Sequence, residues 1–562
     1  MKAHGSQLPR NERLWWRDAV TYQIYIRSFA DSNGDGKGDV EGIRSRLPYL
    51  KELGIDAIWI TPWYPSPQID HGYDVADFMA IEPDYGTLAE AERLIMETHD
   101  HGIKFLVDLV PNHSSSMHKW FQEALKAAPG SPERARYHFL DGKGENGELP
   151  PNNWNSVFGG PAWQRVVEAD GTLGQWYLHL FAVEQPDFNW DNPDVRNYFI
   201  DVLKFWLDRG VDGFRIDVAH GMVKAPGLPD IVEADPDSEM LAAETRPFWD
   251  QDGVHEIYRH WRKVLDSYSG DRMAVAEAWV SPASRIARYL RHDELANSFN
   301  FDFLSSPWKP ASLKEMIDRS LEALKEVGAP SSWVFNNHDV VRSVDRFDLG
   351  LLAGSGNTTF ERQGDPAKFN LKRGTLRARA GALLMLALPG GAYVYQGEEL
   401  ALPEARDIPE DRLTDPSWAM SDYTDRGRDG CRVPLPWKKD PAGAFGFSSK
   451  PPLTPDEAWL PQSENWGDFA VERQDGDPAS TLSMYRNALA IRHAEAGLGD
   501  GPMSWIEAGE HVLAFSRPGN FACYVNFGHA IELPAHSEIL ISSAPLHGSK
   551  LPTDTAVWLR LP

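Results

Sequence analysis

The sequence predicts an α/β protein built around a (β/α)8 TIM barrel, with an inserted subdomain after strand 3 and a C-terminal antiparallel β domain. Short, β-rich apolar runs recur along the chain, and helical stretches follow them. About eight repeats of this alternation are typical of a parallel barrel. Several of the runs also end in a carboxylate, and the C-terminal strand ends of such a barrel form its active-site face. The runs are residues 22–29, 57–63, 105–110, 213–217, 274–279, 333–339 and 392–399, with 297–303 as a weaker member.

Two long segments interrupt the alternation. Residues 112–184 follow the third strand and are rich in Trp, Pro, Asn and Gly, and residues 403–470 follow the eighth strand. The first is too long for an ordinary connection, so we expect it to form a subdomain. Residues 480–493 are typical of a last barrel helix, and strand-like segments follow it. The predicted domains are the catalytic barrel (1–111 and 185–498), the inserted subdomain (112–184) and a C-terminal β-sandwich (499–562).

The composition narrows the possible partners. The 562 residues carry a formal net charge of -26, and surplus carboxylates repel phosphate backbones, so we expect no nucleic-acid partner. No run of about 18 apolar residues occurs, and the N-terminus has no signal-peptide pattern, so we expect a cytoplasmic protein without membrane contact, although leaderless export remains open. The two cysteines, Cys431 and Cys523, exclude a disulfide scaffold, which fits a reducing compartment. We expect a monomer or a small homo-oligomer.

Three of the strand ends carry candidate catalytic carboxylates. Arg215 lies two residues before Asp217 in GFRID, so both side chains share one face of the strand, and the Arg favours an ionised nucleophile. Glu277 ends an apolar, Trp-lined run, which favours the protonated form that a general acid needs. NNHD brings His338 and Asp339 together. Taken singly, each pattern also suits a structural ion pair, a solvent-facing Glu or an ordinary His–Asp contact.

The ordered set of motifs resembles the α-amylase family. DLVPNHSS (108–115), GFRIDVAHG (213–221), AEAW (276–279) and NNHD (336–339) resemble its four signature segments. QPDFN (185–189), residues 23–43 and DHGYDVADF (70–78) resemble its oligo-1,6-glucosidase and α-glucosidase branch. The resemblance covers about residues 15–470. It implies a retaining, exo-acting α-glucosidase that releases α-glucose from the non-reducing end of short α-1,4- or α-1,6-linked oligosaccharides and disaccharides, without an organic cofactor.

The resemblance also implies roles for the matching residues. Asp217 would be the nucleophile and Glu277 the acid/base of a double displacement. Asp339 would hold the sugar 2- and 3-hydroxyls, and His113 and His338 would bind the same sugar.

Four further residues complete the implied sugar site. Arg215 would support the nucleophile, and Tyr73 would supply an aromatic face under the ring. Asp70 and Arg432 resemble a pair that closes the far end of the glucose site, so the chain would accept only a terminal glucose. The alternative is that these two are surface charges that never meet. Asp108 and Asn112, near the end of the third strand, resemble structural residues of the family.

A metal loop is predicted near the N-terminus. DSNGDGKGD (31–39) places oxygen-bearing side chains at Asp31, Asn33, Asp35 and Asp39, with Lys37 between the last two. The spacing resembles an EF-hand-like calcium loop, although Gly42 stands where a bidentate Glu would close a true EF-hand. Related glucosidases carry a similar loop, which implies a structural Ca²⁺. The alternative is a plain Asx-rich turn.

The linkage preference and the fate of the glucosyl group stay open. Val218 resembles the residue of α-1,6-cleaving members, but Ala278 and Trp279 after the acid/base, and Val340 and Val341 after Asp339, depart from the usual pattern. A glucosyltransferase or a sucrose isomerase would use the same carboxylates. A non-catalytic relative on the same fold would lack these carboxylates, whereas Asp217, Glu277 and Asp339 are all present in this chain.

Overall fold

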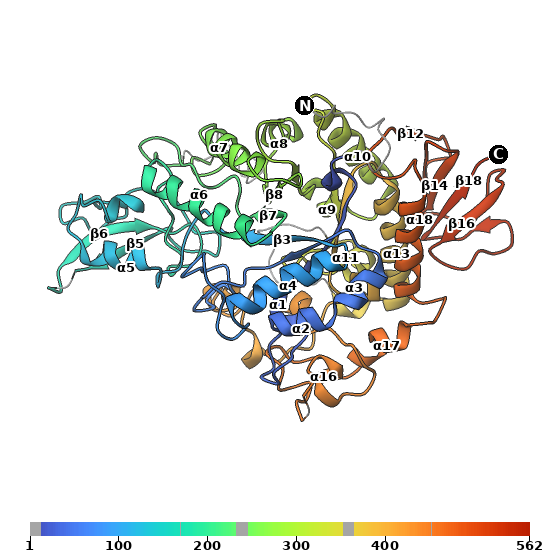
Figure 1. Cartoon of the computed structure of the whole chain (residues 1–562), viewed down its shortest axis with the longest axis horizontal. Helices are drawn as coiled ribbons and strands as arrows, with labels where there is room; N and C mark the ends of the chain where they lie inside the picture. The colour runs from blue at the N-terminus through green and yellow to red at the C-terminus, as the bar shows by residue number, and fades with distance from the viewer. Residues whose placement is uncertain (1–12, 169, 232–245, 352–364, 451) are drawn as a thin grey trace.

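The computed structural model describes residues 13–168, 170–231, 246–351, 365–450 and 452–562, and it confirms the predicted barrel (Figure 1). Eight parallel strands pair in the order β10-β11-β1-β2-β3-β7-β8-β9. A parallel bridge between Phe299 and Ser332 joins the two ends of this sheet and closes it. The strands are β1 (Val20–Ile24), β2 (Ala57–Ile60), β3 (Lys104–Leu109), β7 (Gly213–Ile216), β8 (Met273–Ala276), β9 (Asn297–Ser298), β10 (Ser332–Val334) and β11 (Gly391–Tyr395).

Helices connect the strands and cover the outside of the barrel. Their starts follow from local signals: Thr87 and Glu90 form a reciprocal capping box at α4, and Asn192 followed by Pro193 begins α6. The covering helices are α2 (Val40–Ser45), α3 (Leu47–Leu53), α4 (Leu88–Asp100), α6 (Pro193–Asp208), α7 (Val254–Asp266), α8 (Ala283–Tyr289), α10 (Pro310–Lys325), α13 (Leu371–Ala387) and α18 (Thr481–Ala494). None of the described helices is long and apolar enough to cross a membrane.

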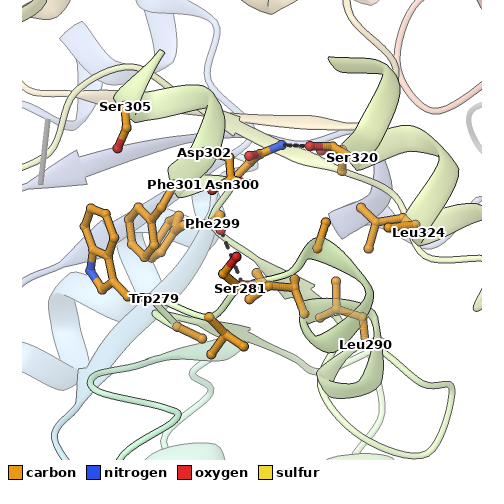
Figure 2. A pocket seen from close by; sticks show the side chains of 17 residues that line it. Trp279, Ser281, Leu290, Phe299, Asn300, Phe301, Asp302, Ser305, Ser320 and Leu324 are labelled. Atoms are coloured by element: carbon orange, nitrogen blue, oxygen red, sulfur yellow. Dashed lines mark hydrogen bonds between the residues drawn. The ribbon is translucent and has the colours of Figure 1, made fainter. Parts of the chain in front are cut away.

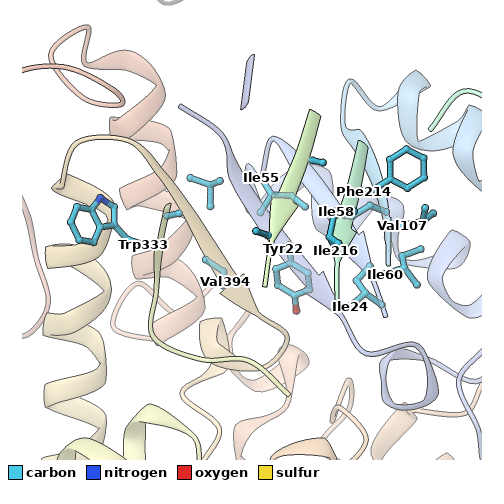
Figure 3. Packing of buried hydrophobic residues seen from close by; sticks show 14 of the residues in the cluster. Tyr22, Ile24, Ile55, Ile58, Ile60, Val107, Phe214, Ile216, Trp333 and Val394 are labelled. Carbon is cyan, nitrogen blue, oxygen red and sulfur yellow. The ribbon is translucent and has the colours of Figure 1, made fainter. Parts of the chain in front are cut away.

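The strands bury side chains on both faces, as a closed parallel barrel requires. In β2, Ile58 and Ile60 join the large cluster that also contains the buried faces of the helices, whereas Ala57 and Trp59 join a smaller cluster with Leu106. Figure 3 shows the side chains of the larger cluster, including Ile58 and Ile60, on adjacent barrel strands. The smaller cluster therefore fills the barrel interior and lies beneath the candidate site described below.

Two outlying parts flank the barrel (Figure 1). Between β3 and α6, helix α5 (Lys119–Lys126) and an antiparallel sheet project from the barrel, with strands in the order β4 (Phe139–Leu140), β6 (Leu173–Leu178), β5 (Trp163–Val167). At the other end, five antiparallel strands pack on α13. In sheet order they are β12 (Ser504–Trp505), β13 (Val512–Arg517), β14 (Phe521–Asn526), β18 (Thr555–Arg560) and β16 (Glu538–Ser542); β15 (Ile531–Glu532) pairs with β17 (Lys550–Leu551).

Several of the predicted strands are shorter than expected, and two of them are followed at once by a short helix. The first ends at Ile24, and Ile26–Phe29 is the helix α1. Because the partner strand β11 stops at Tyr395, the side chain of Gln396 accepts the Tyr25 N–H at 2.7 Å and the ladder ends there. The weaker candidate at 297–303 keeps only the strand β9. Asn300 then caps the helix α9 (Phe301–Ser305) by accepting the N–H of Phe303.

Candidate active site

Three carboxylates meet at one buried guanidinium. Arg215, in β7 and only 2% exposed, donates through Nη1 to Asp108 Oδ1 at 3.0 Å and to Asp217 in a short contact. Its Nη2 lies 3.1 Å from Oε2 of Glu277. The three acids belong to β3 or directly follow β7 and β8, which are neighbours in the sheet. Parallel strand ends therefore deliver the acids to one point, and the spacing of Arg215 and Asp217 places both on one face, as predicted.

Burial and crowding govern the charges of this cluster. Burial raises the pKa of Asp108, and Arg215 only partly offsets it, leaving a value of about 7. Burial also raises the pKa of Asp217, with Arg215 opposing and Glu277 and Asp108 adding repulsion. Arg215 favours the ionised form of Asp217, as expected, but burial and the two neighbouring acids oppose it, because one cation faces three carboxyl groups. Such groups titrate together, so a proton on one carboxyl lowers the pKa of the others.

The Glu277 carboxylate is held from both sides. Its Oε2 accepts the backbone N–H of Val218 at 2.8 Å, and its Oε1 accepts the indole N–H of Trp279 at 3.2 Å. Val218 has a φ of 44°, a left-handed conformation that is costly for a β-branched residue. This conformation follows Asp217 directly, so the same turn places the Asp217 carboxylate and aims an N–H at Glu277.

Asp339 lies after β10 among positive groups. Its Oδ1 accepts from Arg428 Nη1 and from Arg432 Nη2, both at 3.0 Å, and its Oδ2 lies 3.4 Å from His338 Nε2. Burial would raise the pKa of Asp339, but His338, Arg428 and Arg432 together lower it below its ordinary value. Asp339 is thus an ionised acceptor, unlike the carboxyl cluster around Arg215.

The partner of Asp70 differs from the prediction. Asp70 Oδ1 pairs with Arg428 Nη2 at 2.8 Å, whereas Arg432 reaches Asp339 and places its Nη1 2.8 Å from His71 Nδ1. Arg428 also donates to Asp415 at 2.6 Å, so it joins three carboxylates. The two arginines lie four residues apart at the start and end of the short helix α15 (Asp429–Arg432), with Arg428 as its N-cap residue. Both point to the same region, and the sequence offered no local signal for choosing between them.

The predicted aromatic and histidine residues join the two carboxylate groups. The rings of Tyr73 and His338 stack at 5.2 Å and 6°, and the Tyr73 hydroxyl donates to Asp108 Oδ2 at 3.2 Å. Burial, and then the charge of Asp108, raise the pKa of Tyr73, and Asp217 and Asp339 add to the rise. Tyr73 therefore lies within the electrostatic reach of both carboxylate groups.

His113 belongs to the same network at the end toward the inserted subdomain. Its Nε2 lies 3.1 Å from Gln185 Nε2, and that amide donates to Asp70 Oδ2 at 3.3 Å. Burial lowers the pKa of His113 to about 4, so the ring is neutral near pH 7. Gln185 was not singled out beforehand, although QPDFN supplied the signal.

A buried lysine ties three loops together and was also missed. Lys224 Nζ lies 2.8 Å from Asp187 Oδ2, donates to Asn112 Oδ1 at 2.9 Å and makes a short contact with the Gly221 carbonyl. Asn112 follows β3, Asp187 ends the inserted segment and Gly221 follows β7. The lysine therefore fixes the inserted subdomain against the strand ends of the site.

The predicted calcium loop has suitable donor atoms but satisfies them internally. Asp31 accepts backbone N–H groups of Asn33, Gly34 and Gly36, and Asp35 accepts the N–H of Lys37. The Lys37 ammonium pairs with Asp84 at 2.6 Å, and Asp39 caps α2 through the N–H of Gly42. Within the described part of the chain, no group of three or more His, Cys, Asp or Glu is arranged to hold a metal ion. The arrangement fits the Asx-rich alternative, and calcium stays a prediction.

Comparison with known proteins agrees with this geometry. A probable α-glucosidase of Rhizobium meliloti is 36% identical over the full length of both chains. An oligo-1,6-glucosidase of Parageobacillus thermoglucosidasius is 36% identical over 86% of this chain and 84% of that one. Among solved structures, the α-glucosyl transfer enzyme XgtA has a TM-score of 0.82 at 33% identity and covers 98% of this chain and 99% of its own. The trehalulose synthase MutB of Pseudomonas mesoacidophila has a TM-score of 0.81 at 30% identity, covering 97% and 99%.

The match to a family is equally extensive. Residues 23–501 match the α-amylase catalytic domain, a span that contains all of the barrel except the start of β1 and every residue of the carboxylate network. The chain belongs to the α-amylase family.

Proposed function

We propose that the protein is a retaining, exo-acting α-glucosidase that releases α-glucose from the non-reducing end of short α-1,4- or α-1,6-linked oligosaccharides and disaccharides. The observation that carries the proposal is the joint contact of Asp217 and Glu277 with Arg215 at two neighbouring strand ends. Retaining glycosidases need a nucleophile and an acid/base about 5–5.5 Å apart, and one guanidinium between the two acids holds them close together.

The mechanism follows from the sharing of protons in this cluster. When Glu277 carries a proton, one of the negative charges that repel Asp217 is removed. Asp217 then remains the ionised nucleophile beside Arg215. Asp217 attacks the anomeric carbon while Glu277 protonates the leaving oxygen, and a glucosyl–enzyme ester forms. Water then attacks the ester after Glu277 takes its proton, and the second inversion restores the α configuration.

Exo action follows from the closed end of the site. Arg428 joins Asp70 and Asp339 with donor distances of 2.8 and 3.0 Å, and its fork geometry makes a rigid wall. Such a wall suits the hydroxyls of a terminal glucose and leaves no room for a further unit.

Transfer of the glucosyl group is the second candidate function. Two similar structures are those of an α-glucosyl transfer enzyme and a trehalulose synthase, at 33% and 30% identity. In such reactions another hydroxyl replaces water as the acceptor, and the carboxylates keep their roles. Chromatography of products from maltose, isomaltose, sucrose and trehalose distinguishes free glucose from transfer products and fixes the linkage preference.

Asp217→Asn and Glu277→Gln are each expected to lower kcat for maltose by several orders of magnitude, because a nucleophile and an acid/base act as one unit. Purified variants are compared with the wild type by glucose release, and circular dichroism checks the fold. Asp318→Asn, which removes an exposed carboxylate of α10, serves as the matched control and should keep wild-type rates. Near-normal turnover by either active-site variant would refute the assignment.

The glucose released first is expected to be the α anomer, because two inversions at one carbon retain its configuration. Proton NMR of the product within the first minutes, before mutarotation, measures the anomer directly. Initial β-glucose would mean single displacement and would contradict a glucosyl–enzyme intermediate.

Arg428→Ala is expected to lower kcat/KM for disaccharides at least about tenfold, because Asp70 and Asp339 lose the cation between them. Arg428→Lys keeps the positive charge but lacks the forked guanidinium, so its kcat/KM should lie between the values of the wild type and of Arg428→Ala. Initial-rate kinetics on maltose and on maltooligosaccharides of increasing length provide the test. Rapid internal cleavage of starch by the wild-type enzyme would show that the pocket is open.

We further propose that the loop of Asp31, Asn33, Asp35, Lys37 and Asp39 binds a structural Ca²⁺, since its donor set is oxygen-rich. Adding CaCl2 to EDTA-treated protein should then raise Tm by several degrees, as a ligand at a hundredfold excess over Kd contributes about 2.7 kcal/mol. Asp35→Asn should weaken the effect. Identical melting curves with EDTA and with CaCl2 would identify the loop as an Asx-rich turn.

A further inference from the structure

The two oxygens of the Glu277 carboxylate have unlike surroundings. Oε2 accepts the Val218 N–H at 2.8 Å and faces Arg215 Nη2 at 3.1 Å. Among the described residues, Oε1 has a single donor, the indole N–H of Trp279 at 3.2 Å. A carboxylate oxygen has two lone pairs, so a proton on Oε2 would displace one of two donors, whereas Oε1 has room for a proton beside its one contact. The acid proton therefore belongs on Oε1.

Trp279 is itself held in one orientation. Its ring lies on Phe301 at a centroid distance of 4.0 Å and an interplanar angle of 5°, and Figure 2 shows the two rings side by side. Phe301 packs against Phe299, which contacts Trp59 and Tyr393 of the barrel interior. Stacked aromatic rings of this kind attract each other beyond the effect of the area that they bury. The aromatic row thus fixes the direction in which the indole N–H points.

An open space next to the stacked rings explains why the indole of Trp279 needs this support. A cavity of about 280 Å³ lies beside Trp279 and Phe301, between the loop that follows β8 and helices α8 and α10 (Figure 2). Its lining is largely apolar and includes Ile286, Leu290 and Leu324. An indole that lost its stacking partner would have an apolar volume to turn into, and the contact with Glu277 would be lost.

We propose that Trp279 is a positioning residue that fixes the orientation of the Glu277 carboxyl group, so that Oε1, the oxygen that carries the transferable proton, stays aimed at the leaving oxygen. The inference rests on the proposed role of Glu277 as acid/base. In the first step, the proton leaves Oε1 for the glycosidic oxygen as the bond from that oxygen to C1 breaks. The bonding pair stays on the leaving oxygen, and an Asp217 oxygen bonds to C1. In the second step, water bonds to C1, the Asp217 ester bond breaks, and Oε1 regains a proton from that water.

Trp279→Phe tests this role, because it keeps an aromatic ring on Phe301 and removes the N–H together with the five-membered part of the indole. A sugar leaving group needs the proton, whereas 4-nitrophenolate leaves without one. Trp279→Phe should therefore lower kcat/KM for maltose about tenfold or more and that for 4-nitrophenyl α-glucoside less than about threefold.

Two further variants complete the test. Trp505→Phe removes an indole–carboxylate bond of the same kind, to Asp318 at 2.6 Å on the surface, and should leave both substrates at wild-type rates. Phe301→Leu keeps the indole but removes its support, and should reproduce the loss on maltose. Should Trp279→Phe fail to fold, as judged by circular dichroism, Phe301→Leu alone decides.

The outcomes separate this inference from the proposed function. Equal losses on both substrates, or no loss on maltose, would overturn the positioning role while the wild type still releases glucose. If the wild type releases no glucose from any α-glucoside, or Glu277→Gln stays active, the proposed function fails first.

Discussion

The buried guanidinium of Arg215 is the constraint on which the site depends. Three strand ends each bring a carboxylate to it, and these acids would repel one another in the barrel interior without a cation between them. Removing one member of such a buried group commonly costs about 3–5 kcal/mol, because it leaves uncompensated charge. The ion network therefore holds three strand ends of the barrel together and brings the two acids of the proposed mechanism next to each other.

Other buried cations, farther from Arg215, also pair with several acceptors at once. Lys224 fixes the inserted subdomain through Asp187 and Asn112, and Arg428 connects the segment after the eighth strand to Asp70 and Asp339. In a chain with a net charge of -26, each cation at the site serves more than one acceptor. These contacts bring together loops that are distant in sequence. An acceptor without a contact to one of these cations would be left buried and unpaired.

Local patterns predicted the parts of the structure that local geometry determines. The strand–helix alternation, the carboxylates at strand ends and the shared face of Arg215 and Asp217 all follow from short periods within one segment. The choice of Arg428 over Arg432 does not, because its partner Asp70 lies 358 positions away. The raised pKa of Asp217 escaped prediction for the same reason: Asp108 and Glu277 come from other strands, and their repulsion, added to burial, outweighs the adjacent arginine.

The turn at Val218 couples the two proposed catalytic groups into one mechanical unit. Its left-handed backbone follows Asp217 at once and directs the Val218 N–H to Glu277 Oε2, while the N–H of Ala219 bonds the Glu277 carbonyl at 2.8 Å. One strained turn and one guanidinium therefore hold the two proposed catalytic groups at their spacing. Double displacement needs that spacing in both half-reactions, whichever acceptor attacks the ester. A hydrolase and a transferase can accordingly share this unit, and in this chain Ala278 and Trp279, directly after Glu277, depart from the usual pattern.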